Sequence, residues 1–278
     1  MTDKILAGKT AFITGATGAI ATASAIALAQ SGATIVLMAR RADGLEEAKR
    51  EILSAHGDAN IHLITGDCLD PENVKSALKD AHAINDRLDI IFATVGGGGF
   101  APLLTMDADN LTAEFELNVK SAFLAIRHGA PLMDGGSIIC LSSGSGTMPF
   151  RYLTGYCVGK AGLEMLVQQA AEELGSAGIR VNAIRPGMTR SHGTAPMFDA
   201  PGLTDSFLPE YPLERLGDPE DIAAVARFLA GPESAWITGQ SIAADGGNTL
   251  RKSPDLSPMV ETMLGEGSVA KLKAGKEI

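Results

Sequence analysis

Short runs of β-branched and apolar residues alternate with longer segments rich in alanine and leucine along almost the whole chain. This alternation predicts strands joined by helices, the order that builds a parallel sheet with helical crossovers. Several runs, such as TIVLM at 34–38, are apolar throughout, as expected when helices cover both faces of a sheet. The predicted fold is an α/β, doubly wound, parallel seven-stranded sheet. Its strands are expected at 10–14, 34–38, 61–65, 89–94, 137–141, 180–184 and 241–244, and its helices at 19–30, 45–55, 71–85, 108–133, 152–174 and 219–230.

One domain is expected for residues 1–250, because no repeat or low-complexity linker interrupts this rhythm. Residues 188–212 contain four prolines and no strand pattern, which is typical of a loop that borders a substrate site. The alternative for this segment is a disordered excursion. Residues 251–278 are interpreted as a C-terminal tail or as an arm over a neighbouring subunit, and a frayed tail is favoured.

The charge balance and the cysteine count limit the class of function. Lysine and arginine total 23 against 33 for aspartate and glutamate, and the net charge of −10 opposes binding to nucleic acids or anionic membranes. Three cysteines are too few for a disulfide framework, and free thiols indicate the cytoplasm. The five histidines are scattered, so no metal site is expected. We also expect no export signal and no membrane span, since no apolar run is long enough for either.

The first predicted strand leads through TGATGAI at 14–20 directly into the first predicted helix. Gly15 and Gly18 allow a tight turn that presents the amides at the start of the helix to a pyrophosphate. This predicts a dinucleotide site, and the alternative is a plain connection between strand and helix. Arg40 and Arg41 follow the second predicted strand, where an acidic residue would favour NAD. A guanidinium there can pair with a 2′-phosphate, so NADP(H) is favoured over NAD(H), with Arg40 as the contact, unless both arginines face solvent.

Tyr156 and Lys160 are four residues apart in a predicted helix, which places both on one face. A lysine ammonium beside a phenol is expected to lower the tyrosine pKa, so that the phenol can exchange a proton during hydride transfer. Ser143 at the end of the fifth predicted strand and Asn118 in a predicted helix are further candidates. The alternatives are a turn-forming serine and a solvent-facing asparagine.

With these ordered segments the chain resembles the short-chain dehydrogenase/reductase family. The match extends over about residues 6–249 and includes TGATGAI at 14–20, LNVKSAF at 117–123, YCVGK at 156–160 and IRVNAIRPG at 179–187. The resemblance implies a Rossmann fold and a homotetramer or dimer built on the helices at 108–133 and 152–174. It implies that Tyr156 is the acid/base, that Lys160 binds the ribose and tunes Tyr156, that Ser143 polarises the carbonyl, and that Asn118 holds a proton-relay water. It also implies cofactor contacts at Gly15, Thr17, Gly18, Ile20, Arg40, Asp67, Cys68, Gly96, Tyr156, Lys160, Pro186, Thr189 and Ser191.

Two departures from the family pattern bear on the cofactor site. The usual Asn-Asn-Ala-Gly after the fourth strand is ATVG at 93–96, so the hydrogen bonds of the asparagine amides are lost or replaced. The glycine turn carries Ala19 and Ala21 where further glycines are common, and their methyl groups are expected to weaken cofactor binding if either residue must adopt a positive φ.

The sequence therefore predicts an oxidoreductase that transfers a hydride between NADP(H) or NAD(H) and a ketone or secondary alcohol. An apolar or cyclic substrate is indicated by apolar residues on segments that are expected to border the pocket, namely Phe100, Met148, Phe150, Met188, Met197, Phe198 and Phe207. The alternative is a nucleotide-binding sensor or scaffold that keeps this fold and has lost efficient catalysis.

Overall fold

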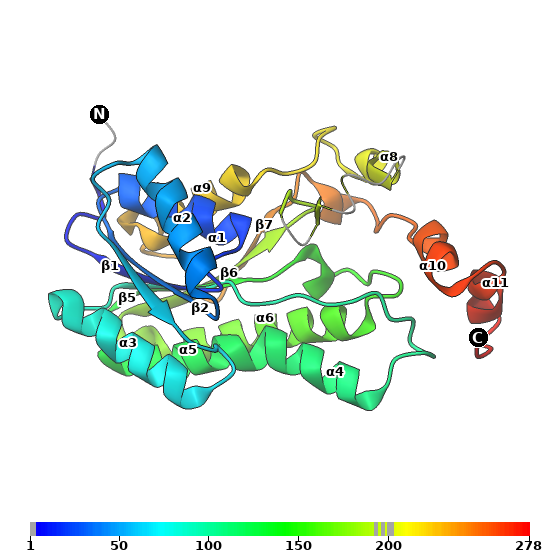
Figure 1. The fold of residues 1–278 in the computed structure, drawn as a ribbon, viewed down its shortest axis with the longest axis horizontal. Coiled ribbons are helices and arrows are strands. Elements are labelled where there is room, and N and C mark those ends of the chain that lie inside the picture. Colours follow the sequence, from blue (N-terminus) through cyan, green and yellow to red (C-terminus); the bar gives the residue numbers. More distant parts are fainter. Residues whose placement is uncertain (1–3, 192–193, 196–197, 199–202) are drawn as a thin grey trace.

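Seven parallel strands form one sheet in the order β3-β2-β1-β4-β5-β6-β7 (Figure 1). The computed structural model describes residues 4–191, 194–195, 198 and 203–278. The strands are β1 (Thr10–Thr14), β2 (Thr34–Ala39), β3 (Ile61–Thr65), β4 (Ile90–Ala93), β5 (Gly136–Leu141), β6 (Ile179–Pro186) and β7 (Ser241–Ala244). The chain order reverses direction across the sheet at β1 and β4, which is the position where this architecture binds nucleotides. The predicted fold class is confirmed.

The longer helices are α1 (Ala19–Gln30), α2 (Ala42–Ala55), α3 (Pro71–Asn85), α4 (Ala108–Phe115), α5 (Ser121–Gly129), α6 (Thr154–Leu174) and α9 (Pro219–Ala230). Shorter helices are α8 (Leu203–Phe207), α10 (Ser257–Leu264) and α11 (Ser268–Lys273), and a π-helical turn, η1 (Glu116–Lys120), joins α4 to α5. Single 3-10 turns occur at Ala130–Leu132, Gly144–Gly146, Gly175–Ala177, Leu208–Glu210, Pro232–Ser234 and Asn248–Leu250. Among the residues that the structure describes, no helix combines the length and the apolarity needed to cross a bilayer.

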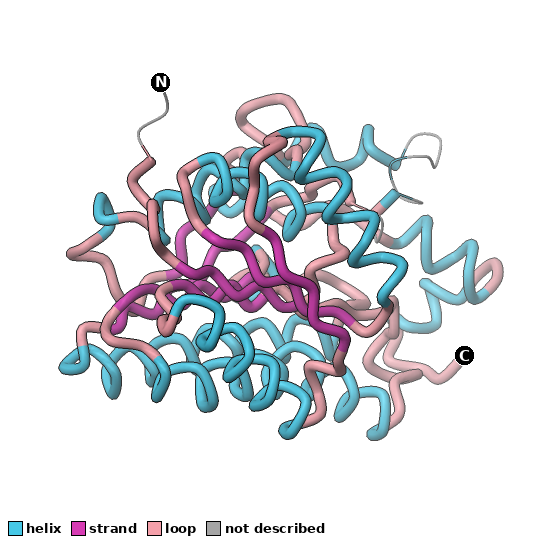
Figure 2. The backbone as a smooth tube through the Cα atoms, turned by 60° about the vertical axis from the view of Figure 1, so that its left-hand side comes forward, coloured by secondary structure: helices cyan, strands magenta, loops and turns pink. Residues whose placement is uncertain are grey.

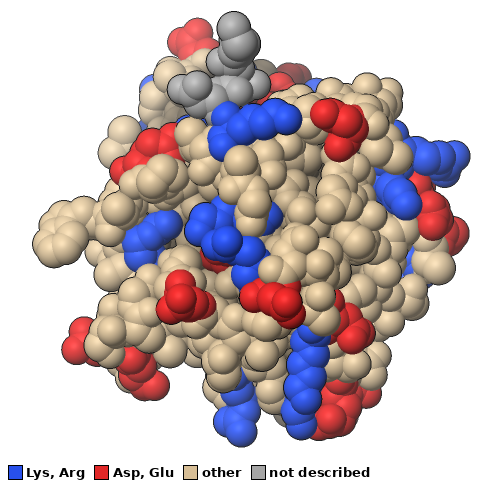
Figure 3. Space-filling model, turned by 90° about the vertical axis from the view of Figure 1, so that its left-hand side faces the viewer, with Lys and Arg blue, Asp and Glu red and all other residues tan. Residues whose placement is uncertain are grey.

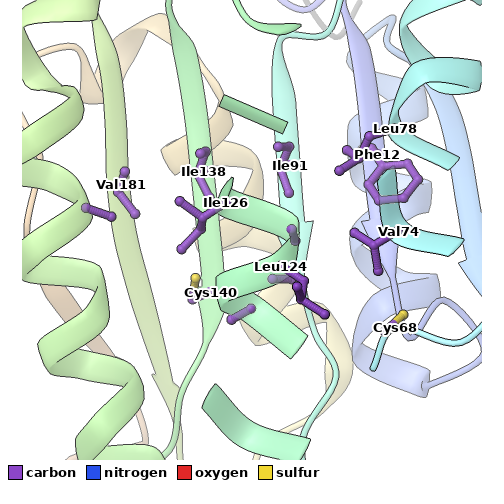
Figure 4. Close-up of a cluster of buried hydrophobic side chains, with 14 of the residues drawn as sticks. Phe12, Cys68, Val74, Leu78, Ile91, Leu124, Ile126, Ile138, Cys140 and Val181 are labelled. Carbon is purple, nitrogen blue, oxygen red and sulfur yellow. The ribbon is translucent and has the colours of Figure 1, made fainter. Parts of the chain in front are cut away.

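Helices cover the sheet on both faces, and Figure 2 shows the strands as a central layer between them. Successive strand residues point to opposite faces, so the sheet supplies two cores. Phe12 contributes to the core beneath α3, α5 and α6, where Figure 4 shows it beside Val74 and Leu78. Ile13 contributes to the core beneath α1, α2 and α9. This double burial explains why strands such as β2 and β4 are almost entirely apolar.

The helix predicted at 108–133 is wrong as a continuous element. The structure divides it into α4, the π turn η1, α5 and a final 3-10 turn. The extra residue of the π turn lies where the buried side chain of Asn118 turns inward to bond with the backbone of Gly97. The helix predicted at 152–174 begins two residues later, because Tyr152 has φ +68° and cannot continue a right-handed helix.

The C-terminal segment is not a frayed tail, and that expectation is wrong. Residues 257–264 and 268–273 form α10 and α11, which lie at the end of the molecule away from the N-terminus (Figure 1). Glu261 of α10 accepts hydrogen bonds from the amides of Gly267 and Val269, which joins the two helices into a hairpin. Leu256 precedes the hairpin, is 1% exposed, and packs with Phe207 and Tyr211. Burial of this apolar anchor holds the segment in place.

Basic and acidic side chains are interspersed on the face of the molecule shown in Figure 3. Elsewhere in the chain, charges also form ion pairs, such as that between Lys9 and Asp89. On this face, therefore, the basic side chains do not form a continuous basic surface of the kind that binds nucleic acids.

Candidate active site

A cleft of about 1140 Å³ opens at the carboxyl ends of the central strands. The residues that line it come from the ends of β1, β2, β4 and β5 and from the loops and helices that follow them. Nine of the predicted cofactor contacts line this cleft: Gly15, Thr17, Gly18, Ile20, Arg40, Asp67, Cys68, Gly96 and Ser191. Its size and position suit an extended dinucleotide.

The glycine turn has the geometry that the sequence predicted. Gly15 has φ +60°, and a Cβ at this position would lie 2.8 Å from the hydroxyl of Thr94. Gly18 caps α1, and no side chain caps that end of the helix or places a carboxylate in its first turn. The amides at this helix end therefore offer an anion site that fits a pyrophosphate. Ala19 and Ala21 lie within α1 and have no positive φ, so the strain considered for them does not arise.

Thr94 takes over part of the role of the missing asparagines. Its hydroxyl donates to the carbonyl of Thr14 at 2.5 Å, and its amide donates to the hydroxyl of Thr14 at 3.2 Å. The ends of β1 and β4 are thus tied together beside the glycine turn. At positions 93–96, hydrogen bonds of the Thr94 hydroxyl and amide therefore stand where the family pattern has asparagine amides. The carboxyl ends of β1 and β4 remain joined.

Asn118 holds the loop that follows β4. Its Oδ1 accepts from the amide of Gly97 at 3.0 Å, while its Nδ2 donates to the carbonyls of Gly97 at 2.7 Å and Glu114 at 2.8 Å. The side chain is fully buried, so the solvent-facing alternative is wrong. Its amide is engaged with backbone, which fixes the loop carrying Gly96 next to Lys160.

The structure brings Ser143, Tyr156 and Lys160 together beside the cleft, next to Gly96 and Leu141, which line it. The Ser143 side chain faces the hydroxyl of Tyr156 and favours its charged form. The Ser143 hydroxyl itself donates to the hydroxyl of Ser145 and accepts from the Ser145 amide, both at 3.2 Å. The ammonium nitrogen of Lys160 lies 5.6 Å from the centre of the Tyr156 ring and donates to the carbonyl of Leu141 at 2.7 Å. Ser143 follows β5, and the other two residues lie one turn apart on α6.

The expected acidification of Tyr156 is wrong for this structure. Burial raises the pKa of its hydroxyl, and the neighbouring Ser143 side chain offsets this only in part. Burial also lowers the pKa of Lys160 to about 8, against the opposing influence of Cys140 and Glu164. The same low-polarity surroundings therefore act on both partners and disfavour the charged form of each.

Two predicted cofactor contacts, Pro186 and Thr189, do not line the cleft, and neither do Tyr156 and Lys160. Thr189 is buried, and its hydroxyl donates to the carbonyl of Gly187 at 3.0 Å. Contact of these residues with a cofactor stays a prediction.

The sequence reasoning missed the wall that α2 contributes to the cleft. Arg41, Gly44, Glu47 and Glu51 line it beside Arg40. Glycine at position 44 permits close packing, since a Cβ there would lie 2.9 Å from Thr17. The spacing of residues 44, 47 and 51 places them on one helical face and was the available signal.

The apolar residues predicted to border a substrate pocket are only partly gathered. Phe100, Met188 and Phe207 lie in one cluster with Tyr211 and Leu256. Phe198 instead lies under the guanidinium of Arg190, 4.4 Å from ring centre to Cζ. Met148 and Phe150 are both half-buried on the loop before α6, and Met197 is outside the described residues.

Comparisons with known proteins agree with this geometry. Residues 15–249 match a family model described as enoyl-(acyl carrier protein) reductase. A short-chain type dehydrogenase/reductase from Mycobacterium ulcerans has a similar structure, with a TM-score of 0.90 and 30% identity over 94% of this chain and 97% of that one. The chain belongs to the short-chain dehydrogenase/reductase family.

Curated relatives in this family are dehydrogenases of small molecules. An L-rhamnose 1-dehydrogenase (NAD(P)(+)) of Sphingomonas sp. is 33% identical, over 88% of this chain and 97% of its own length. A 7alpha-hydroxysteroid dehydrogenase of Escherichia coli is 35% identical, over 87% and 94% respectively. This short-chain dehydrogenase/reductase is therefore an enzyme that uses a nicotinamide cofactor to interconvert alcohols and ketones.

Proposed function

We propose that the enzyme reversibly reduces a ketone to a secondary alcohol, with Tyr156 as the proton donor. The observation that carries the proposal is the grouping of Ser143 and Tyr156, with Lys160 one turn along the same helix, beside a cleft that begins with a glycine turn. The bound nicotinamide would supply the hydride. The cofactor site fits such a group because the uncapped end of α1 and Gly15 form a cradle for its pyrophosphate.

Each polar group then has a separate task. Tyr156 keeps its proton at neutral pH because burial raises its pKa, which suits a general acid in the direction of reduction. In this proposal Ser143 donates to the substrate oxygen, where negative charge develops. Lys160 is charged below about pH 8 and stabilises the phenolate that Tyr156 becomes after the proton leaves. Asn118 keeps the 96–97 loop beside these groups.

Replacement of Tyr156 by phenylalanine tests the assignment. The ring remains and the transferable proton is lost, so kcat should fall by about a thousandfold or more while cofactor affinity is retained. Tyr152→Phe is the matched control, since it removes a hydroxyl from the neighbouring tyrosine. Near-normal turnover of Tyr156→Phe would contradict the proposal. Cofactor binding by the wild type without turnover of any ketone or alcohol would support the sensor alternative.

We further propose a preference for NADP(H). Arg40 and Arg41 line the cleft beyond β2, and Arg41 is engaged at 3.7 Å with Asp43, which leaves Arg40 as the proposed partner of the 2′-phosphate. Arg40→Ala should weaken NADPH binding about tenfold, equivalent to ~1.4 kcal/mol, and leave NADH binding unchanged. Arg50→Ala, which removes an arginine from α2, is the control. Unchanged NADPH affinity in Arg40→Ala would exclude this role.

We propose that the substrate is apolar or cyclic. Phe100, Met188 and Phe207 cluster beside the segment that enters α6, and one relative is a steroid dehydrogenase. Other relatives are a rhamnose dehydrogenase and a galactitol 2-dehydrogenase, so sugars and polyols belong in the same test panel. Turnover restricted to sugars or charged hydroxy acids would refute the apolar assignment.

We also propose a homo-oligomer, a dimer or tetramer, built on α4, α5 and α6. Phe115, Phe123 and Met165 of these helices are 45%, 41% and 58% exposed, and a second copy would bury them. Light scattering after size exclusion measures the mass, and a monomer at micromolar concentration would exclude the assembly. A cytoplasmic location is proposed because Cys68, Cys140 and Cys157 are all free thiols.

A further inference from the structure

Three consecutive residues at the end of β5 face three residues on one side of α6. The carbonyl of Leu141 accepts from Lys160 at 2.7 Å, the hydroxyl of Ser142 donates to Glu164 at 2.7 Å, and the side chain of Ser143 faces Tyr156. Tyr156, Lys160 and Glu164 are spaced four residues apart, so they lie along one stripe of the helix. Two of these three helix residues have proposed roles in the reaction, and Glu164 has none.

Glu164 is a buried carboxylate with a complete set of partners. It is 5% exposed, and besides Ser142 it accepts from Nε of Arg185 at 2.7 Å and from Nη2 at 2.5 Å. Arg185 lies at the end of β6, one residue before Pro186. A bidentate pair of this kind fixes both side chains and orients them. The carboxylate therefore connects the ends of two neighbouring strands to the helix that carries Tyr156.

The turn beside this carboxylate leaves no room for a side chain at Gly146. A Cβ on Gly146 would lie 2.6 Å from Oε1 of Glu164 and 3.2 Å from the hydroxyl of Ser142. The turn that follows Ser143 is thus shaped around Glu164. A carboxylate in this position is costly to bury and needs its cation, which sets it apart from an ordinary packing contact.

We propose that Glu164, held by Arg185 and Ser142, is a positioning residue of the active site, which fixes the end of β5 against α6 and keeps the ammonium of Lys160 charged and in place. This inference rests on the proposed roles of Tyr156 and Lys160. The charge of Glu164 opposes the loss of the proton from Lys160, one turn away.

The other polar and titratable groups around Lys160 come from several elements. Tyr156 lies on the same helix, Cys140 on β5 and Asn118 on the π turn, whose Oδ1 shares the space beside Gly96 with the lysine nitrogen. Arg185 lies on β6 behind Glu164, and Asp245 acts on Arg185 from the residue after β7. Burial raises the pKa of the Cys140 thiol to about 12, so near pH 8 it is neutral and has no charge to act on the lysine. Glu164 is the charged group that raises the pKa of Lys160.

The test is a titration of Lys160 in the full-length, cofactor-free protein. With 13C at the lysine Cε positions, NMR follows each amine against pH, and Lys160→Arg identifies the Lys160 signal by its loss. The wild-type midpoint should lie at about 8. Glu164→Gln should lower it by about one pH unit or more, because the stabilising charge is gone. Arg185→Met should raise it, because Glu164 then has Lys160 as its remaining buried cation.

Glu172→Gln, which removes an exposed carboxylate from the same helix, should leave the midpoint unchanged. Circular dichroism checks that each variant is folded. Glu164→Gln and Arg185→Met have predicted shifts of opposite sign, so either one, if it folds, tests the proposal by itself. If neither folds, the double variant Glu164→Gln/Arg185→Met leaves no unpaired charge and should titrate below the wild type. An unchanged midpoint in any of these folded variants overturns the proposal.

The pH profile of kcat/KM connects this titration to the reaction. In Glu164→Gln the alkaline limb of this profile should move to lower pH by the same amount as the NMR midpoint. The value of kcat/KM on the low-pH plateau should fall less than the value at alkaline pH. Normal turnover of Tyr156→Phe would refute the proposed function and leave the NMR result standing. Loss of turnover in Tyr156→Phe together with an unshifted Lys160 midpoint in Glu164→Gln would refute the role of Glu164 alone.

Discussion

Gly96 lies where a Cβ would be 2.6 Å from the amine nitrogen of Lys160 and 2.8 Å from Oδ1 of Asn118. Its φ is not positive, so an alanine there meets a steric obstacle without backbone strain. Gly96→Ala should displace both side chains and lower kcat/KM by about a hundredfold, the size expected for a displacement near 1 Å.

The same loop provides a matched control for that substitution. A Cβ on Gly99 would have its nearest contact at 3.8 Å, to Oε1 of Glu114, so Gly99→Ala should retain activity. Steady-state kinetics of the two variants and a cofactor titration make the comparison. Equal losses in both variants would show that the loop is sensitive in general, and would contradict a specific role for the space beside Lys160.

At single positions, sequence reasoning predicted residue types and spacing better than it predicted electrostatics. The spacing of Tyr156 and Lys160 placed them on one helix face, and the turn residues Gly15 and Gly18 occupy the expected conformations. The direction of the Tyr156 pKa was wrong because burial depends on residues distant in the chain. The pairing of Glu164 with Arg185 escaped notice because the two residues are 21 positions apart and meet only where the end of β6 packs against α6.

At the level of elements, periodicity predicted the strands and most of the longer helices. It failed where a side-chain hydrogen bond or a contact between distant residues determines the backbone conformation. The π turn around Asn118 depends on bonds to Gly97, which no local pattern reveals. Apolar Leu256 is isolated in a polar, proline-containing stretch, so nothing in the sequence indicated that it is an anchor. Its partners Phe207 and Tyr211 lie more than forty residues earlier in the chain.

The C-terminal segment should influence substrate binding through that anchor. Leu256 packs on Tyr211, whose hydroxyl accepts from the amide of Met188 at 2.6 Å, just beyond the end of β6. Leu256→Ala removes a buried contact, and a core truncation of this type costs about 2 to 5 kcal/mol locally. We expect KM for the ketone to rise about tenfold, equivalent to ~1.4 kcal/mol, with unchanged cofactor affinity.

Met263→Ala serves as the control for this anchor, because Met263 belongs to the same hairpin and is 57% exposed. It should leave KM at the wild-type value. Thermal unfolding separates the two effects of Leu256→Ala. A lower unfolding temperature with an unchanged KM would show that the anchor serves stability only.

In the whole molecule, chemistry and structural support lie at opposite ends of the sheet. The carboxyl ends of the strands carry the cleft and the Ser143, Tyr156 and Lys160 group. The amino ends are joined by Asp89, which accepts from Lys9, from the amide of Thr10 and from Arg87. Parallel sheets allow this separation, since all strands present the same end to the active site.

Asp89→Asn should therefore reduce stability and leave catalysis intact. Its hydrogen bonds with Arg87, Thr10 and Lys9 hold the pKa of Asp89 below its usual value against the opposing influence of burial. A carboxyl with a lowered pKa stabilises the fold above the pKa of the unfolded chain and ceases to do so as pH falls through the folded value. Urea unfolding at pH 7 should show a loss of about 2 kcal/mol in Asp89→Asn.

The gap between Asp89→Asn and the wild type should narrow as pH falls below about 4, because the Asp89 carboxyl of the unfolded wild-type chain then takes up a proton before the folded one does. Asp80→Asn, at an exposed position of α3, should match the wild type throughout. Turnover at pH 7 under native conditions should equal that of the wild type, since Asp89 lies at the end of the sheet remote from Tyr156. A stability loss that stays constant down to pH 3, or a fall in kcat, would show that Asp89 acts through something other than its charge at the amino end of the sheet.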